Sequence, residues 1–112
     1  GHLGRALEES GVGAQIHTEN VLFLPETHKL AEDGFIPGGS RRNLEWLSDR
    51  LDVGECTEIE VLLLADAQTS GGLLFGVDED KASDALDELT ASGHSASIIG
   101  SVIDGDGEII LK

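Results

Sequence analysis

The sequence is organised around one stretch, which is Asp66-Ala67-Gln68-Thr69-Ser70-Gly71-Gly72-Leu73-Leu74-Phe75-Gly76-Val77. It joins two apolar runs, 61–65 and 73–77, through a polar turn that contains two adjacent glycines. Adjacent glycines allow positive φ angles and a close approach of the backbone to a neighbour. Thr69 and Ser70 offer hydroxyls beside backbone N–H groups, and such groups can donate hydrogen bonds to a bound anion. The turn therefore predicts either a tight corner that leads into a buried strand or part of an anion site, and both interpretations stay open.

A second glycine-led segment lies earlier in the chain and is Gly38-Gly39-Ser40-Arg41-Arg42-Asn43. Ser40 is a good N-cap for a helix with Leu44, Leu47 and Leu51 on one face. This assignment puts Arg41 and Arg42 in the first helical turn, where the dipole favours acids by about 0.3–1 kcal/mol each. The two arginines predict either an anion site at a helix N-terminus or ion pairs with the many acids of this chain.

The remaining pattern predicts an α+β fold, with helices packed on a mixed β-sheet. Residues 58–65 are apolar on most faces, so periodicity does not decide between helix and buried strand. The sequence Asp104-Gly105-Asp106-Gly107 is typical of a hairpin turn between two terminal strands. Gly11 follows the first helix as a C-cap, and Asp78 is expected to cap the last. We expect helices over 1–10, 25–31, 40–51 and 78–92, and strands over 12–17, 73–77, 96–103 and 108–112.

Length and charge restrict the function classes. A chain of 112 residues is expected to form one domain over 1–112. Its 22 acids against 7 basic residues give a net charge of −15, which predicts no nucleic-acid or membrane partner. Such an acidic surface also suggests a salt-adapted host, in which cations screen the self-repulsion. No apolar run approaches a membrane span or a signal peptide, and the single cysteine fits a cytoplasmic protein.

No recognisable catalytic or metal-binding set is present in the sequence. Cys56 has no histidine or basic residue near it in sequence and is expected to be a spectator. The four histidines are scattered, without paired spacing. Asp104, Asp106 and Glu108 superficially resemble an EF-hand start, but Ile109 occupies the position that requires glycine. We therefore expect no catalytic residue and no metal ligand in this chain.

Several motifs together resemble one enzyme family. Residues 66–74 resemble the D-P-Q-T-S-G-G-L-L signature of the selenophosphate synthetase (selenide, water dikinase) family. Residues 36–43 are similar to its P-G-G-[ST]-R-x-N segment, and Gly1-His2-Leu3 resembles the end of its G-L-L-G-H-L helix. Segments 22–25 and 98–102 also fit, so the resemblance covers nearly the whole chain in the right order. Ala67 departs from the pattern, because the family usually has proline there.

The resemblance implies the C-terminal domain of a two-domain enzyme related to AIR synthetase. That family makes selenophosphate from selenide and ATP, with magnesium, and releases AMP and phosphate. Its catalytic Cys or selenocysteine, its Lys and most magnesium ligands belong to an N-terminal nucleotide-binding domain that this chain does not contain. The resemblance thus implies a kinase parent that is a homodimer in the cytoplasm. It also implies a fragment that is inactive and binds no cofactor alone.

The resemblance also suggests what the two glycine-led turns do. In the parent enzyme this domain would pack against the nucleotide domain and cover the phosphates of ATP, where hydrogen-bond donors are needed. The candidate phosphate-facing residues are Gly38, Gly39, Ser40, Arg41, Arg42, Asn43, Gln68, Thr69, Ser70, Gly71 and Gly72. The alternative is a non-catalytic α+β module that binds a small molecule or dimerises, with both turns as ordinary corners.

Overall fold

The computed structural model describes residues 1–68 and 70–112 and has the expected α+β architecture. Four strands form a mixed sheet within the described residues, in the order β2-β4-β1-β3. β1 (Val12–Ile16) is antiparallel to β3 (Gly100–Asp104) and parallel to β4 (Ile109–Leu111), which is parallel to β2 (Leu51–Asp52). The predicted fold class is therefore confirmed, with two parallel pairs and one antiparallel pair.

Helices and the inner strands share one apolar core. The helices are α1 (His2–Ser10), α2 (Thr27–Glu32), α3 (Gly38–Leu47), α4 (Glu58–Leu64) and α5 (Ala82–Ala91). Short 3₁₀ turns cover Thr18–Asn20, Ser48–Arg50 and Glu79–Lys81. The buried core cluster is Leu7, Ala14, Ile16, Leu47, Val61, Ile109 and Leu111. It thus joins α1, α3 and α4 to the two central strands.

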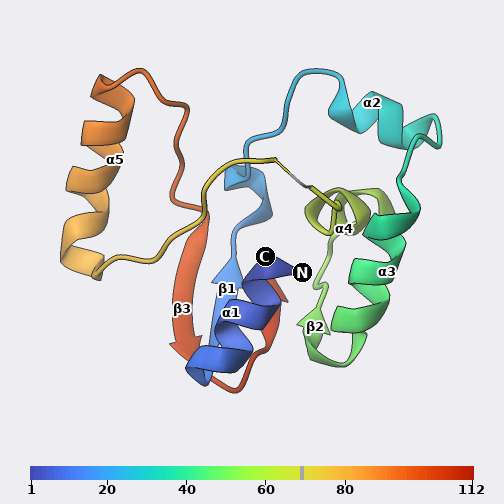
Figure 1. The fold of residues 1–112 in the computed structure, drawn as a ribbon, viewed down its shortest axis with the longest axis horizontal. Coiled ribbons are helices and arrows are strands. Elements are labelled where there is room, and N and C mark those ends of the chain that lie inside the picture. Colours follow the sequence, from blue (N-terminus) through green and yellow to red (C-terminus); the bar gives the residue numbers. More distant parts are fainter. Residues whose placement is uncertain (69) are drawn as a thin grey trace.

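The structure divides the helices between two sides of the molecule (Figure 1). α3 and α4 lie together on one side, and α5 stands apart on the other. α5 contains no fully buried residue, so its apolar face is only half covered. The stretch that begins at Asp66 leads from α4 toward α5 and crosses the molecule between these two groups.

The ends of two helices follow local sequence rules. Gly11 ends α1 in the left-handed conformation, with φ 64°, as predicted. α4 settles the ambiguity at 58–65 in favour of helix, because Thr57 and Glu60 form a capping box. The Thr57 backbone N–H donates to Glu60 Oε2 at 2.7 Å, and the Glu60 N–H donates to Thr57 Oγ1 at 3.3 Å. α2 begins two residues later than predicted, at Thr27.

The prediction of Ser40 as an N-cap is wrong. α3 begins at Gly38, its N-cap is Pro37, and Ser40 lies inside the first turn. The helix ends at Leu47, and Leu51, which was assigned to its apolar face, begins β2. Asp78 is likewise no side-chain cap of α5, because a 3₁₀ turn precedes that helix and the Asp78 carboxylate pairs with Lys81.

The predicted central strand at 73–77 is also wrong. These residues have no regular secondary structure, and Leu73 is 87% exposed. A strand needs a neighbour along its edge, and the edge of β3 away from β1 is unpaired among the described residues. Apolar composition predicts that a segment can be buried in a sheet, but it does not show which edge would receive it.

The predicted terminal hairpin is wrong in its pairing. β3 and β4 are not neighbours, because β1 lies between them and pairs with both. The turn at 104–107 therefore passes across the end of β1, and the Gly107 N–H donates to the Val12 carbonyl at 2.9 Å. The β3 strand starts at Gly100, four residues later than predicted, and the β4 strand covers only three residues.

Candidate functional site

The structure brings the start of α3 against the chain that leaves α4. The Ser40 hydroxyl donates to Asp66 Oδ1 at 2.8 Å, and the Asn43 side-chain amide donates to the Ala65 carbonyl at 3.0 Å. An ideal β-carbon built on Gly39 would lie 2.6 Å from the Ala67 β-carbon. Three consecutive residues, 65–67, thus contact the first two turns of α3. The two glycine-led segments predicted from sequence are neighbours in space.

One glycine is required here by close approach, which is Gly39. The Ala67 β-carbon fills the space beside Gly39, so no side chain fits at that helical position. Within the second segment, a β-carbon on Gly71 would meet only the Gln68 side chain, which is exposed and can rotate away. Gly72 and Gly38 are less confined: a β-carbon on Gly72 would meet nothing within 4 Å, and one on Gly38 would meet only Arg42.

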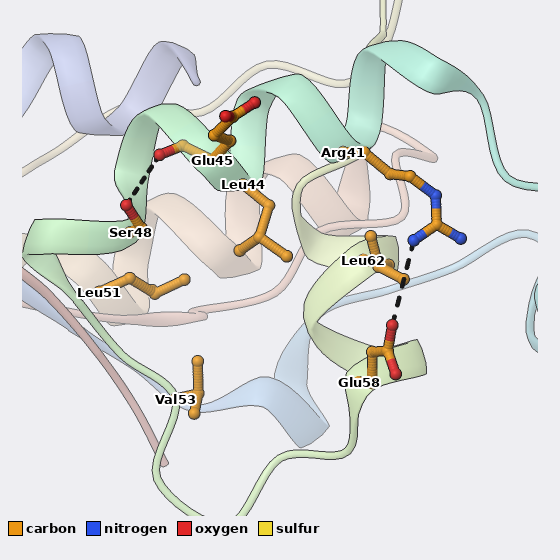
Figure 2. A pocket seen from close by; sticks show the side chains of 8 residues that line it. All are labelled: Arg41, Leu44, Glu45, Ser48, Leu51, Val53, Glu58 and Leu62. Atoms are coloured by element: carbon orange, nitrogen blue, oxygen red, sulfur yellow. Dashed lines mark hydrogen bonds and ion pairs between the residues drawn. The ribbon is translucent and has the colours of Figure 1, made fainter.

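The two arginines of α3 point in different directions. The Arg42 guanidinium lies over the glycine pair, with Nη1 3.5 Å from an ideal β-carbon on Gly38 and Nη2 3.8 Å from one on Gly39. Arg41 points to α4, where its Nη1 lies 4.0 Å from Glu58 Oε1, and both side chains are exposed (Figure 2). Exposed pairs of this kind contribute at most about 1 kcal/mol. None of the ion pairs found among the described residues includes Arg42.

The candidate residues from the sequence therefore fall into three groups. Gly39, Ser40 and Asn43 contact residues 65–67, with Ser40 completely buried. Gly38, Arg41 and Arg42 lie at the exposed start of the helix, where Arg42 lies beside the glycine pair and Arg41 points to Glu58 of α4. Gln68, Ser70, Gly71 and Gly72 are exposed and lie outside helices and strands. Thr69 lies outside the described residues. Sequence reasoning missed Asp66 as a partner of Ser40, although both residues stand in the two motifs.

A shallow apolar groove lies on the Arg41 side of α3 (Figure 2). Its volume is about 440 Å³, and Leu44, Leu51, Val53 and Leu62 supply its apolar walls. The Arg41–Glu58 pair stands at one rim, and Ser48 donates to the Glu45 carbonyl at the other. This groove is separate from the contact between α3 and residues 65–67. It therefore does not belong to the two glycine-led segments, 38–43 and 66–72, which are called the paired glycine segments below.

Two carboxylates near turns have shifted pKa values with local causes. The hydrogen bonds from Thr57, backbone first and then side chain, lower the pKa of Glu60. The backbone N–H of Asp106, followed by that of Glu108 itself, lowers the pKa of Glu108. The Glu108 carboxylate turns back onto its own loop, where Oε2 accepts from the Asp106 N–H at 2.6 Å. Both carboxylates therefore accept hydrogen bonds from their own turns and stabilise them locally. Neither faces the paired glycine segments.

The described residues contain no cluster of three or more His, Cys, Asp or Glu that fits a metal ion. Asp66 is the acid nearest to the paired segments, and Ser40 already occupies its Oδ1.

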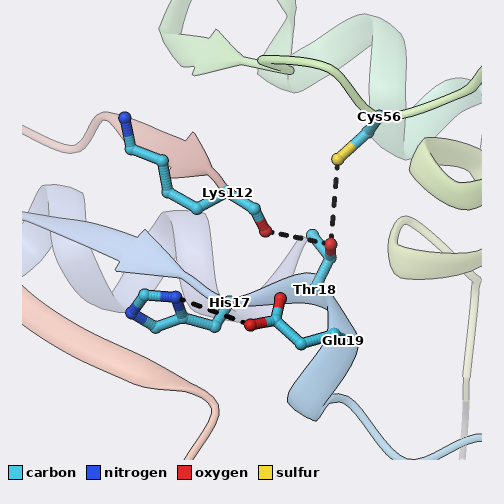
Figure 3. A network of polar contacts seen from close by, with 5 residues as sticks. All are labelled: His17, Thr18, Glu19, Cys56 and Lys112. Atoms are coloured by element: carbon cyan, nitrogen blue, oxygen red, sulfur yellow. Dashed lines mark hydrogen bonds and ion pairs between the residues drawn. The ribbon is translucent and has the colours of Figure 1, made fainter.

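Cys56 lies in a polar contact at the end of the sheet (Figure 3). Its Sγ is 3.9 Å from Thr18 Oγ1, and that hydroxyl donates to the Lys112 carbonyl at 3.0 Å. His17 lies beside Thr18 but pairs with Glu19 at 4.0 Å. Cys56 is half-buried and packs against the core cluster. These contacts place Cys56 away from the paired glycine segments.

Comparison with known proteins decides the family. The family model for AIR synthase related protein, C-terminal domain, matches residues 1–112. The chain belongs to this family. The paired segments of this AIR synthase related domain therefore lie in a C-terminal domain whose relatives are known enzymes.

Curated relatives of this AIR synthase related domain include selenide, water dikinases. The one from Porphyromonas gingivalis is 44% identical over 108 residues, which are 95% of this chain and 31% of the relative. The one from Carboxydothermus hydrogenoformans is 37% identical over 113 residues, covering 100% of this chain and 33% of the relative. The one from Aliarcobacter butzleri is 38% identical over 107 residues, with 92% and 31% covered. The domain thus spans about a third of the length of these relatives.

Proposed function

We propose that this domain is the C-terminal part of a selenide, water dikinase. The parent would use ATP and selenide to make selenophosphate, with release of AMP and phosphate. The support is the family match over residues 1–112 and the similarity to selenide, water dikinases, of which the chain spans about a third. The rest of such a parent would supply the nucleotide-binding domain and the catalytic groups. The parent would act as a cytoplasmic homodimer with magnesium.

Within that parent, we infer that the paired glycine segments cover the phosphates of ATP. The observation that carries this proposal is the contact between α3 and residues 65–67, which brings the Gly38–Gly39 pair and Arg42 close to the residues that lead into Gln68. Phosphoryl transfer depends on donors that are positioned before the reaction. Arg42 supplies a guanidinium, and the first amides of α3 supply backbone donors at the positive end of its dipole. The isolated chain would be inactive and would not hold ATP alone.

The orientation of the two arginines provides the experiment. In the full-length protein that carries this chain, Arg42→Ala is expected to lower the ATP-dependent rate by about 10- to 100-fold, because one charge-assisted hydrogen bond contributes about 1.5–3 kcal/mol. Arg41→Ala is the matched control, since its side chain points to Glu58 of α4, whereas Arg42 is the arginine beside Gly38 and Gly39. We expect Arg41→Ala to change the rate less than threefold, and Ser70→Ala to act in the direction of Arg42→Ala.

Equal rates for the wild type and the Arg42→Ala variant would contradict this proposal and leave both segments as structural corners. A large loss in Arg41→Ala alone would point to the groove instead. Circular dichroism of each variant at the assay temperature checks that the loss is not unfolding.

The groove on the Arg41 side favours a second candidate, which is a non-catalytic module that binds a small molecule. Pockets of about 300–1,000 Å³ with apolar walls and a few polar groups are typical ligand sites, and this groove has about 440 Å³. Titration calorimetry of this chain separates the two candidates. A covering domain is expected to take up neither ATP nor a metabolite alone, whereas a binding module is expected to take up a metabolite without the rest of the parent.

A further inference from the structure

Among the described residues, Ser40 is the one polar residue that is completely buried, with an exposed fraction of 0%. Its hydroxyl donates to Asp66 Oδ1 at 2.8 Å across 26 positions of sequence. A buried hydroxyl is tolerated in a core only when a partner satisfies it. The bond to Asp66 therefore joins two elements that nothing in the local sequence requires to meet.

The helix does not need this hydroxyl for itself. Pro37 is the N-cap of α3, and no side chain caps that end. The Ser40 backbone N–H already donates to the Pro37 carbonyl at 3.1 Å. Serine inside a helix usually turns to its own backbone or to solvent. Here the hydroxyl reaches to Asp66, just beyond the end of α4, so it stabilises the contact between the two segments and not the helix itself.

The residues on either side of Asp66 also contact the start of α3. Asn43 donates to the Ala65 carbonyl at 3.0 Å, and Ala67 packs against the bare backbone of Gly39. Beyond Ala67 the described residues up to Val77 are exposed and outside helices and strands. Among these residues, the chain that leaves α4 is thus held against α3 at 65–67.

We propose that Ser40 and Asp66 form a latch that fixes residues 65–67 against the start of α3 and so sets the point from which the chain continues into Gln68. Ser40 is then a positioning residue, which acts on phosphate binding through Asp66 and the turn and does not touch the phosphate. This inference rests on the proposed function for the role of the turn. The latch itself rests on the Ser40–Asp66 bond and the burial of Ser40.

Two readouts in the full-length protein test the latch. Hydrogen exchange measured by mass spectrometry reports on a peptide that spans 65–72, and steady-state kinetics report KM for ATP and kcat separately. In Ser40→Ala we expect exchange in 65–72 to rise at least tenfold, while a peptide within α5 (82–91) stays unchanged. KM for ATP is expected to rise about tenfold, with kcat changed less than threefold, because the donors remain but are no longer held in place.

Conservative variants make the test independent of a folding defect. Ser40→Thr keeps the hydroxyl and is expected to restore exchange and KM to within threefold of the wild type. Asp66→Asn keeps an acceptor for Ser40 and is expected to behave like Ser40→Thr, whereas Asp66→Ala should behave like Ser40→Ala. In the double variant Ser40→Ala/Asp66→Ala, the increase in exchange should equal that of either single variant, since both remove the same bond.

Unchanged exchange in Ser40→Ala overturns the latch, whatever the arginine variants show. Increases that multiply in the double variant also overturn it, because the two side chains then act separately. Faster exchange with an unchanged KM overturns the positioning role of Ser40. The proposed function fails on a different result, which is an unchanged rate in Arg42→Ala.

Discussion

At the scale of single residues, Gly39 is the position where packing against the turn is tightest. Gly39→Ala is expected to destabilise the fold by about 1–3 kcal/mol, because the new β-carbon would lie 2.6 Å from the Ala67 β-carbon and neither atom can rotate away. Gly38→Ala is the matched control. Its β-carbon would meet only the end of the Arg42 side chain at 3.5 Å, so alanine should be neutral or stabilising by up to about 1 kcal/mol.

Urea unfolding of both glycine variants at equal protein concentration gives the comparison. Equal midpoints for Gly38→Ala and Gly39→Ala would show that residues 65–67 can move aside from α3. That result would also weaken the case that this contact sets the position of the turn.

At the scale of elements, α4 is the helix that depends most clearly on its cap. Thr57→Ala is expected to cost about 1 kcal/mol, because it removes the side-chain acceptor for the Glu60 N–H. The hydrogen bonds from Thr57 lower the pKa of Glu60 from an ordinary value of 4.5. A carboxylate with a lowered folded-state pKa stabilises the fold above its unfolded pKa and loses this effect as pH falls through the folded value.

The midpoint difference between the wild type and Glu60→Gln should therefore be full near neutral pH and shrink as pH falls below about 4.5. Thermal unfolding from pH 7 to pH 3 measures it. Glu58→Gln is the control, since Glu58 lies on the same helix turn without a part in the capping box. A constant difference across this range would mean that Glu60 is not held by Thr57 in solution.

The apolar segment 73–77 is the element on which sequence and structure disagree. Phe75 is 51% exposed, so Phe75→Ser is expected to destabilise the fold by no more than about 1 kcal/mol. Leu62→Ala, at a side chain only 3% exposed, should cost about 2–5 kcal/mol. Urea unfolding of the two variants decides the matter, and a cost above about 3 kcal/mol for Phe75→Ser would favour the buried strand predicted from sequence.

Local signals predicted the elements better than their pairing. The Gly11 C-cap and the strand at 12–16 follow from residues within one or two turns, and both are confirmed. The capping box at Thr57 and Glu60 is a local signal too. A threonine followed three residues later by glutamate favours a helix over a buried strand at 58–65. The hairpin at 104–107 failed because turn composition does not reveal that β1 lies between the two strands. Ser40 failed as a cap because its partner is 26 positions away.

At the scale of the whole molecule, the few basic side chains contact single neighbours and leave most of the acidic surface without a positive partner. Arg5 and Arg50 each lie 4.9 Å from the Trp46 ring, and Arg50 also pairs with Glu8 at 2.9 Å. Two of the lysines pair with an acid three or four positions away on their own chain segment. No helix within the described residues is long and apolar enough to cross a membrane. The net charge of −15 therefore remains as mutual repulsion between exposed carboxylates.

That repulsion predicts a fold that salt stabilises. The Debye length falls from about 10 Å at 0.1 M to about 3 Å at 1 M, so salt screens repulsion between carboxylates that are not in contact. Salt also weakens the exposed ion pairs, but each contributes at most about 1 kcal/mol. We expect potassium chloride between 0.1 and 1 M to stabilise the chain by about 1 kcal/mol, which raises the melting temperature by about 4 °C or more.

A charge-reduced variant separates screening from general salt effects on apolar burial. Asp84→Asn, Asp87→Asn and Glu88→Gln together remove three exposed charges from α5 without touching a buried residue. At 0.1 M salt this variant should melt above the wild type, and its melting temperature should rise less steeply with potassium chloride, because less repulsion is left to screen. Parallel salt slopes for the two proteins would assign the stabilisation to apolar burial, and a flat wild-type curve would show that the acidic surface does not oppose folding.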